Sequence, residues 1–190
     1  MAGTHRDRDA RIATAMAENE RALLHYAGRL LGDRDKAADA VQEVFYRLCR
    51  IGRRESQRGP LAPGGDHVRT WLFTVCRNIA FDIRRKEKRM APWDDTLAAS
   101  RGSAAPGPAA TAERRETVGR ALRELDSLPD HQQEVIRLKF ANGFSYREIA
   151  GITGLSISNV GFLIHTAIKT LRRRLGPDPG RPRGFEGAAP

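Results

Sequence analysis

Apolar residues recur along this 190-residue chain at intervals of three and four positions, the spacing of amphipathic helices. No stretch longer than a few residues alternates apolar and polar side chains, as a strand with one buried face would. The pattern predicts three helices in the first half of the chain and four in the second. Their approximate ranges are 12–31, 35–50, 67–89, 113–127, 130–142, 146–153 and 157–175. We therefore expect an all-α protein.

Several predicted helix ends carry residues that are known to stop or cap helices. Gly32 follows the first helix and is expected to end it. Either Asp33 or Asp35 can cap the second helix, because a carboxylate accepts hydrogen bonds from free backbone N–H groups. The later helices also have candidate caps, namely Asp130, Ser156 and the pair Ser145 and Glu148, which has the S-x-x-E spacing of a capping box.

The composition of the chain changes sharply between the two groups of helices. Residues 90–112 are rich in Ala, Gly, Ser and Pro and poor in large apolar residues, so they are predicted to be a flexible linker. The charged residues 1–11 and the low-complexity tail 176–190 are predicted to be disordered. This leaves two small helical domains, at 12–89 and 113–175.

The net charge of +10 and the isoelectric point of about 10.5 favour a polyanionic partner, either nucleic acid or an acidic membrane face. A soluble protein with basic tails would show the same balance, so charge alone leaves both alternatives open. The chain has no run of about 18 apolar residues, and we therefore expect no membrane insertion.

The sequence offers little for catalysis or metal binding. Cys49 and Cys76 occupy apolar helical positions and are predicted to be reduced core residues, as in a cytoplasmic protein. The histidines are scattered, and no Cys or His pair has the spacing of a zinc site. A phosphate-binding loop of the form GxxxxGK[ST] is also missing. We expect no enzyme activity, cofactor, metal or small-molecule substrate.

The segment "SYREIAGITGLSISNVGFLIHTAIKTLRRRL" has the features of a helix-turn-helix. Ala150 is small enough for two helices to approach closely, and Gly154 can adopt the positive φ of the turn. A small apolar core beneath the turn is predicted from Ile149, Leu155 and Val160. Because another helical hairpin could show two of these features, the motif favours DNA binding without proving it.

The second helix of this motif begins with small polar residues. Free N–H groups at a helix N-terminus suit phosphates, and asparagine can bind adenine edges in the major groove. Ser156 is predicted both to cap the helix and to face DNA. The candidate contacts to duplex DNA are Ser145, Arg147, Ser156, Ser158, Asn159, His165 and Lys169.

Three segments together resemble a known family. They are "AADAVQEVFYRL", "VRTWLFTVCRNIAFDIRRKEKR" and "LPDHQQEVIRLKFANGFSYREIAGITGLSISNVGFLIHTAIKTLRRRL". In order and spacing they are similar to the bacterial RNA polymerase sigma factors of the extracytoplasmic-function (ECF) type. The resemblance implies that the first segment docks on the clamp of the polymerase β′ subunit and the second binds −10 DNA. It implies that the third recognises the −35 element beside the β flap.

The first of these segments places polar and acidic residues beside the apolar stripe of its helix. Without the resemblance, an ordinary solvated face would be the better interpretation. With it, the residues expected to contact polymerase are Asp39, Gln42, Glu43 and Tyr46.

The second segment interleaves basic residues with amide and aromatic groups, which suits a melted DNA strand. The candidate −10 contacts are Arg77, Asn78, Phe81, Arg84, Arg85 and Lys88. The resemblance implies that Asn78 helps to form a pocket for an unstacked base. Trp71 could stack on a base or pack in the core, and both interpretations stay open.

Two features depart from the family pattern. Gly161, Phe162 and Leu163 stand where many members have a basic residue, a serine and a second basic residue. The Gly-, Pro- and Arg-rich segment 52–66, predicted to be a loop, is long for the family. Recognition of both promoter elements could therefore differ in this chain.

The sequence thus favours a cytoplasmic promoter-specificity subunit that binds core polymerase and promoter DNA. The family also leads us to expect an anti-sigma partner. The main alternative is a free-standing helix-turn-helix regulator, which would bind a palindromic duplex tightly on its own. A small helical enzyme is a second alternative, and the missing cluster of His, Cys and acidic residues argues against it.

Overall fold

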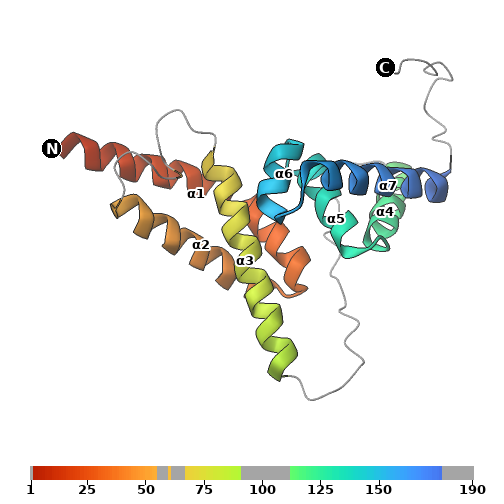
Figure 1. The fold of residues 1–190 in the computed structure, drawn as a ribbon, viewed down its shortest axis with the longest axis horizontal. Coiled ribbons are helices and arrows are strands. Elements are labelled where there is room, and N and C mark those ends of the chain that lie inside the picture. The colour runs from red at the N-terminus through yellow and green to blue at the C-terminus, as the bar shows by residue number, and fades with distance from the viewer. Residues whose placement is uncertain (1, 55–59, 61–66, 91–111, 177–190) are drawn as a thin grey trace.

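The computed structural model describes residues 2–54, 60, 67–90 and 112–176, and every regular element within them is helical (Figure 1). The all-α prediction is confirmed for this part of the chain. The elements are α1 (Ala2–Leu31), α2 (Arg34–Arg54), α3 (His67–Met90), α4 (Ala112–Asp126), α5 (Asp130–Ile136), the π-helical turn η1 (Arg137–Ala141), α6 (Tyr146–Thr153) and α7 (Ile157–Leu175).

The first helix is longer than the hydrophobic pattern predicts. It begins at Ala2, so the segment 2–11, predicted to be disordered, is helical. Ala and Arg recur there and are strong helix formers, and Asp7 and Arg11 have the four-residue spacing that suits a helical ion pair. Local propensity can therefore form a helix where no apolar stripe is visible.

Three other predicted segments lie wholly or mostly outside the described residues. These are the linker at 90–112, the tail at 176–190 and the loop at 52–66. Helix α2 continues to Arg54, so the first three positions of the predicted loop are helical.

The predicted cap of α2 is confirmed at one of its two alternatives. Gly32 adopts a φ of 70°, and its N–H donates to the carbonyl of Gly28 at 2.9 Å. Oδ1 of Asp33 then accepts hydrogen bonds from the backbone N–H groups of Asp35 and Lys36 at 2.9 and 3.1 Å. Asp33 is therefore the cap, and Asp35 is already helical.

The prediction that Asp130 caps the next domain's second helix is wrong. Pro129 occupies the cap position and makes no side-chain cap bond, while its carbonyl accepts from the N–H groups of Gln132 and Gln133. Asp130 is the first residue of α5, where a negative charge still suits the positive end of the helix. Beyond Ile136 the helix widens to π geometry in η1.

Helices α1, α2 and α3 pack around one part of the core, and α4, α5, η1, α6 and α7 around another. In the first part the side chains are aliphatic with few aromatics, and Cys76 is completely buried among them, as predicted. Cys49 is only half-buried at the edge of the core. Fully buried residues of the second part include Val135, Leu138, Ile149 and Val160.

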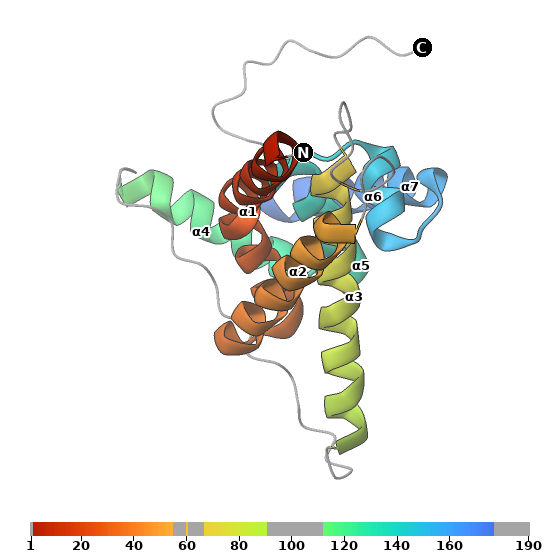
Figure 2. The same ribbon diagram turned by 90° about the vertical axis from the view of Figure 1, so that its left-hand side faces the viewer.

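The two groups of helices also pack directly against each other, with α3 against α6 (Figures 1 and 2). The ring of Phe73 on α3 meets that of Phe144 edge-on, with 4.9 Å between centroids. The guanidinium of Arg69 lies 4.5 Å from the centre of the Phe144 ring. The predicted domains therefore share one continuous core in this structure, which the sequence pattern does not predict.

Candidate nucleic-acid and protein interfaces

Helices α6 and α7 meet at a steep angle, with a bend of 104° at the three-residue break between them. This lies within the range for a DNA-binding helix-turn-helix. The predicted capping box at the start of α6 is confirmed. Ser145 Oγ accepts from the backbone N–H of Glu148 at 3.3 Å, and Glu148 Oε2 accepts from the backbone N–H of Ser145 at 2.7 Å. The hydrogen bond from the Ser145 hydroxyl is the main cause that lowers the pKa of Glu148.

The turn itself has the geometry that its residues predict. Gly154 adopts a φ of 75° and donates its N–H to the carbonyl of Ala150 at 2.9 Å. The hydroxyl of Thr153 donates to the carbonyl of Ile149 and accepts from the N–H of Leu155. Ile149 and Val160 are buried beneath the turn, and Leu155 is half-buried.

All seven predicted duplex-DNA contacts are exposed on the helix-turn-helix. Oγ of Ser156 accepts from the N–H of Asn159 at 3.2 Å, which confirms its role as a cap. Four of the exposed residues of α7 recur at intervals of four, three and four, so they share one face of the helix. We call this face the α7 strip, and it consists of Ser158, Phe162, His165 and Lys169.

The three positions that depart from the family pattern have different environments. Leu163 is half-buried and packs against the core. Gly161 lies beneath an aromatic ring, since a Cβ added there would stand 3.6 Å from Cε2 of Tyr146. Phe162 is 65% exposed and belongs to the α7 strip. The hydrophobic pattern does not distinguish Phe162 from Leu163, because both are apolar neighbours on an amphipathic helix.

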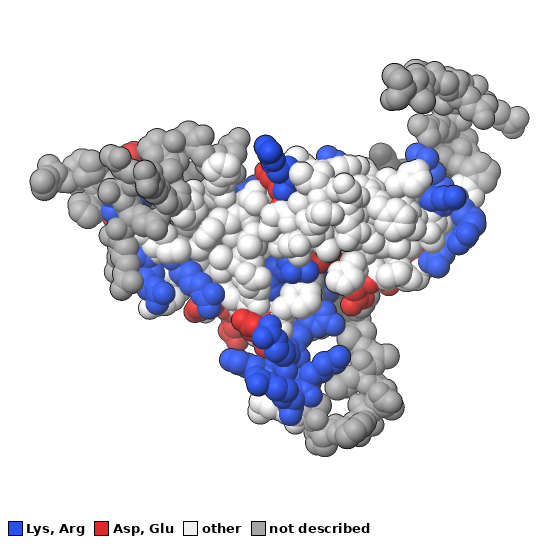
Figure 3. Space-filling model, in the orientation of Figure 1, with Lys and Arg blue, Asp and Glu red and all other residues white. Residues whose placement is uncertain are grey.

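The predicted −10 residues are divided between two environments on α3. The C-terminal half of the helix projects from the rest of the molecule and carries a dense group of basic side chains (Figures 1 and 3). Arg84, Arg85 and Lys88 are exposed there, Asn78 is exposed near the middle of the helix, and Arg85 forms an ion pair with Asp82 at 3.0 Å.

Arg77, by contrast, takes part in a contact between the two groups of helices. Its Nε donates to Oε1 of Glu134 at 2.8 Å, and its guanidinium lies 4.4 Å from the ring centre of the half-buried Phe81. The hydroxyl of Tyr26 on α1 donates to the same carboxylate oxygen at 2.7 Å. Glu134 is only 7% exposed. Neither residue stands out in the sequence, because Tyr26 fits the apolar stripe of its helix and a glutamate such as Glu134 is ordinarily expected to face solvent.

This buried contact shifts the titration of Tyr26. Burial, followed by the nearby negative charge of Glu134, raises the pKa of the Tyr26 hydroxyl well above its usual value. The phenol therefore keeps its proton and donates to the carboxylate. The buried carboxylate of Glu134 accepts two hydrogen bonds from the other group of helices and so holds the two groups together in one specific arrangement.

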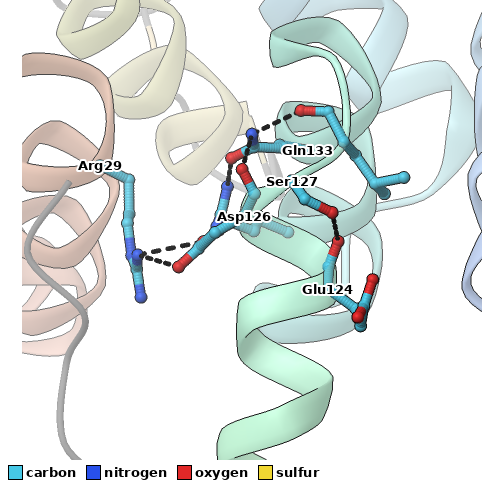
Figure 4. A network of polar contacts seen from close by, with 7 residues as sticks. Arg29, Glu124, Asp126, Ser127 and Gln133 are labelled. Atoms are coloured by element: carbon cyan, nitrogen blue, oxygen red, sulfur yellow. Dashed lines mark hydrogen bonds and ion pairs between the residues drawn. The ribbon is translucent and has the colours of Figure 1, made fainter. Parts of the chain in front are cut away.

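Further polar contacts lie around the contact of Glu134 with Tyr26 and Arg77. Arg29 of α1 reaches Asp126 at the end of α4, with 3.3 Å between Nη1 and Oδ1 (Figure 4). The side-chain amide of Gln133 donates to the carbonyl oxygens of Asp126 and Leu128, which fixes the turn that carries Asp126 (Figure 4). Additional contacts join Thr70 to Glu148, Arg84 to Asp130, and Arg137 to Asp126.

The predicted polymerase-contact residues form one polar strip on α2. Asp39, Gln42 and Tyr46 are exposed, and Tyr46 is 60% exposed despite its large ring. Glu43 pairs with Arg47 one helical turn later, at 2.7 Å. The strip is therefore accessible, with an aromatic side chain at its C-terminal end.

Trp71 is half-buried and packs against the core, which favours the packing interpretation. Within the described ranges, no group of three His, Cys, Asp or Glu side chains could hold a metal ion. In the same ranges no single helix is long and apolar enough to cross a membrane. Helices α6 and α7 reach that length and apolar character only when they are taken together, and they form a sharply bent pair.

Comparisons with known proteins match both groups of helices to one family. Residues 15–90 match Sigma-70 region 2, and residues 119–171 match Sigma-70, region 4. The ECF RNA polymerase sigma factor EcfG of Rhodopseudomonas palustris is 32% identical over 157 residues, which cover 82% of this chain and 80% of the relative. This chain belongs to the ECF RNA polymerase sigma factors.

Another relative of this sigma factor is SigL of Mycobacterium tuberculosis, 30% identical over 88% of the chain and 90% of the relative. Among solved structures, a similar fold occurs in the sigma factor RpoE of Bartonella quintana, which was crystallised with the anti-sigma factor NepR. The TM-score is 0.67 with 24% identity, covering 86% of this chain and 95% of that one. The sigma factor is thus a DNA-binding protein of transcription initiation, with region 2 in α1–α3 and region 4 in α4–α7.

Proposed function

We propose that this sigma factor binds core RNA polymerase and directs it to promoters that carry matched −10 and −35 elements. The observation that supports this most strongly is the combination, in one chain and in order, of a region 2 helix bundle and a region 4 helix-turn-helix. The protein acts in the cytoplasm as a regulatory subunit, without a catalytic reaction or cofactor of its own.

The polar strip on α2 is the proposed docking site for the clamp of the β′ subunit. Its exposed carboxylate, amide and phenol groups suit a basic partner helix. Region 4 would lie at the β flap at the same time, so that polymerase holds both regions. Binding to two sites on one partner gives tighter binding than either site alone.

Region 2 is proposed to capture the melted −10 strand along the projecting half of α3. Arg84, Arg85 and Lys88 would hold phosphates there, and Asn78 would contact an unstacked base. Because the melted state is stabilised by this binding within the holoenzyme, strand opening requires no nucleotide hydrolysis by the sigma factor. Region 4 would place the α7 strip in the major groove of the −35 element.

Regions 2 and 4 must separate before they can bind the −10 and −35 elements at the same time. Elements centred near −10 and −35 lie about 25 base pairs apart, or roughly 85 Å along duplex DNA. The two regions share one core here, and Arg77 is engaged by Glu134 instead of DNA. The chain between Met90 and Ala112 is long enough to reach up to roughly 75 Å, so the two regions can part while they stay joined, and their own dimensions supply the rest of the distance. We infer that the compact form is the resting state of the free protein.

An anti-sigma protein is part of the proposal. RpoE of Bartonella quintana forms a complex with the anti-sigma factor NepR, and its fold is similar to this one. A partner that contacted both regions of the compact form would keep Arg77 engaged and prevent opening.

The proposal is tested by mixing the purified chain with core polymerase and isolating the complex, followed by run-off transcription from genomic promoter fragments. We expect a stable complex and discrete transcripts that share two upstream sequence elements. The alternative, a free-standing helix-turn-helix regulator, predicts tight binding of a palindromic duplex without polymerase. If the chain binds such an operator unaided and fails to bind core polymerase, the proposed function is wrong.

A further inference from the structure

Phe162 occupies the middle of the α7 strip, between Ser158 and His165 on the surface that a helix-turn-helix presents to DNA. Its side chain is 65% exposed, whereas its neighbours Leu163 and Ile164 turn toward the core. The aromatic ring is therefore available to a partner of region 4, and it does not stabilise the fold by packing.

The surroundings of Phe162 leave its ring as the bulkiest exposed group in the first two turns of α7. Ser158, one turn earlier on the strip, is short, and Gly161 has no side chain at all. The space over Gly161 is occupied by the ring of Tyr146, which Lys139 approaches to 5.5 Å. A positive charge therefore stands near this end of α7, while no basic side chain occupies positions 157–163 of the helix.

The chemistry of the major groove offers one apolar group on the base edges, the C5-methyl of thymine. The other edges present hydrogen-bond donors and acceptors, which a phenyl ring cannot satisfy. An exposed phenyl ring in the centre of a recognition strip thus favours a T·A pair through the methyl group. It disfavours G·C and C·G pairs at that position, because the ring would leave their polar edges without water.

We propose that Phe162 contacts a thymine methyl group in the −35 element and makes that T·A pair a requirement of this sigma factor. This inference rests on the proposed function. It names the base pair that Phe162, one of the three departures from the family pattern, selects. The other two departures have a structural explanation. Gly161 lies beneath the ring of Tyr146, and Leu163 packs against the core.

The first experiment uses the full chain assembled with core polymerase and a promoter library with a randomised −35 element. Sequencing of bound DNA should show a strong thymine preference at one or two adjacent positions. Phe162→Ala should remove that preference while leaving the other positions unchanged, and Phe162→Leu should keep part of it. Phe140→Ala is the matched control, because Phe140 is also 65% exposed but lies on η1, outside the helix-turn-helix. It should leave the preference intact.

The second experiment replaces the preferred thymine by deoxyuridine, which lacks only the methyl group. The wild-type holoenzyme should bind this promoter about fourfold more weakly, as expected for the loss of one buried methyl. The Phe162→Ala holoenzyme should bind the thymine and deoxyuridine promoters equally.

Several results would overturn the inference. They are a wild-type holoenzyme with no thymine preference, an equal effect of deoxyuridine on both proteins, and a Phe162→Ala variant that binds core polymerase more weakly with its sequence preference unchanged. The last result would assign Phe162 to a protein contact. A wild-type chain that forms no active holoenzyme is a different result, because it contradicts the proposed function itself.

Discussion

Glycine occupies two positions near the end of α6 that place opposite demands on the backbone. Gly154 has a φ of 75°, a conformation that strains any residue with a Cβ. Gly151 lies in the helix with ordinary geometry, and a Cβ added there would stand 4.0 Å from Cγ2 of Thr70. The same substitution at the two sites should therefore have opposite effects on stability.

We expect Gly154→Ala to lower the free energy of unfolding by about 1–2 kcal/mol, because the new Cβ opposes the left-handed turn. Gly151→Ala should leave the free energy of unfolding unchanged or raise it by up to about 1 kcal/mol, through better helix propensity. Urea denaturation followed by circular dichroism measures both. Equal destabilisation by the two variants would show that the turn is not held in this conformation.

The two cysteines are expected to differ in reactivity because their thiols are buried to different extents. Burial raises the pKa of the Cys76 thiol to about 12, so almost no reactive thiolate is present at neutral pH. Cys49 is half-buried. We expect iodoacetamide to modify Cys49 at least tenfold faster than Cys76 at pH 8, as measured by mass spectrometry of peptides. Rapid labelling of Cys76 in the folded protein would contradict this.

At the scale of the element, the beginning of α6 is fixed by a reciprocal pair of hydrogen bonds. Ser145 and Glu148 each accept a backbone N–H from the other, and Thr70 adds a third contact to the same carboxylate at 3.3 Å. The first helix of the helix-turn-helix is only eight residues long. Its cap therefore contributes a large share of its local stability.

Replacing Ser145 by Ala should lower the free energy of unfolding by about 1 kcal/mol. Ser158→Ala, at an exposed position within α7, is the control and should change it by less than about 0.5 kcal/mol. Thermal denaturation of the two variants gives the comparison. A Ser145→Ala protein as stable as the control would mean that water replaces the cap.

The capping box also makes the free energy of unfolding depend on pH, and its contribution is lost in acid. The pKa of Glu148 is lowered in the folded state, so its ionised form favours folding. This contribution is complete above the ordinary carboxyl pKa of about 4.3 and is lost as pH falls through the lower folded value. The stability difference between wild type and Glu148→Gln should therefore shrink below about pH 4, as measured by urea denaturation at several pH values.

At the scale of the whole molecule, the central feature is the contact between region 2 and region 4. Glu134 brings a buried charge to the interface, and Tyr26 and Arg77 satisfy it from the other side. Removing one partner of such a buried pair leaves the other charge uncompensated, at a cost of about 3–5 kcal/mol. That cost applies to the compact form alone, because water solvates Arg77 once the regions separate.

Glu134→Ala should therefore shift the free protein from the compact to the open form. We expect a larger radius of gyration by small-angle X-ray scattering and tighter binding of single-stranded −10 DNA, with Arg77 released. Glu124→Gln is the matched control, because Glu124 pairs with Arg174 within region 4 at 3.6 Å. If Glu134→Ala has the same radius of gyration as the control, the buried contact does not hold the regions together.

Most of the helices of this protein, and its family, can be predicted from the sequence. Periodicity predicted the helices, and Gly32, Asp33, Ser145, Gly154 and Ser156 marked helix ends that the structure confirms. These signals are reliable because helix spacing, caps and turns depend on residues within about four positions of one another. The resemblance to the ECF sigma factors, with its three segments in order, was likewise visible in the sequence and is confirmed.

The packing of the helices sets which surfaces are exposed and which are covered. It pairs Tyr26 with Glu134 across 108 residues and removes Arg77 from the exposed basic face of α3. It also separates two adjacent apolar residues, with Leu163 against the core and Phe162 at the surface. Such outcomes depend on the fit between helices far apart in the chain, and a local pattern carries no information about that fit.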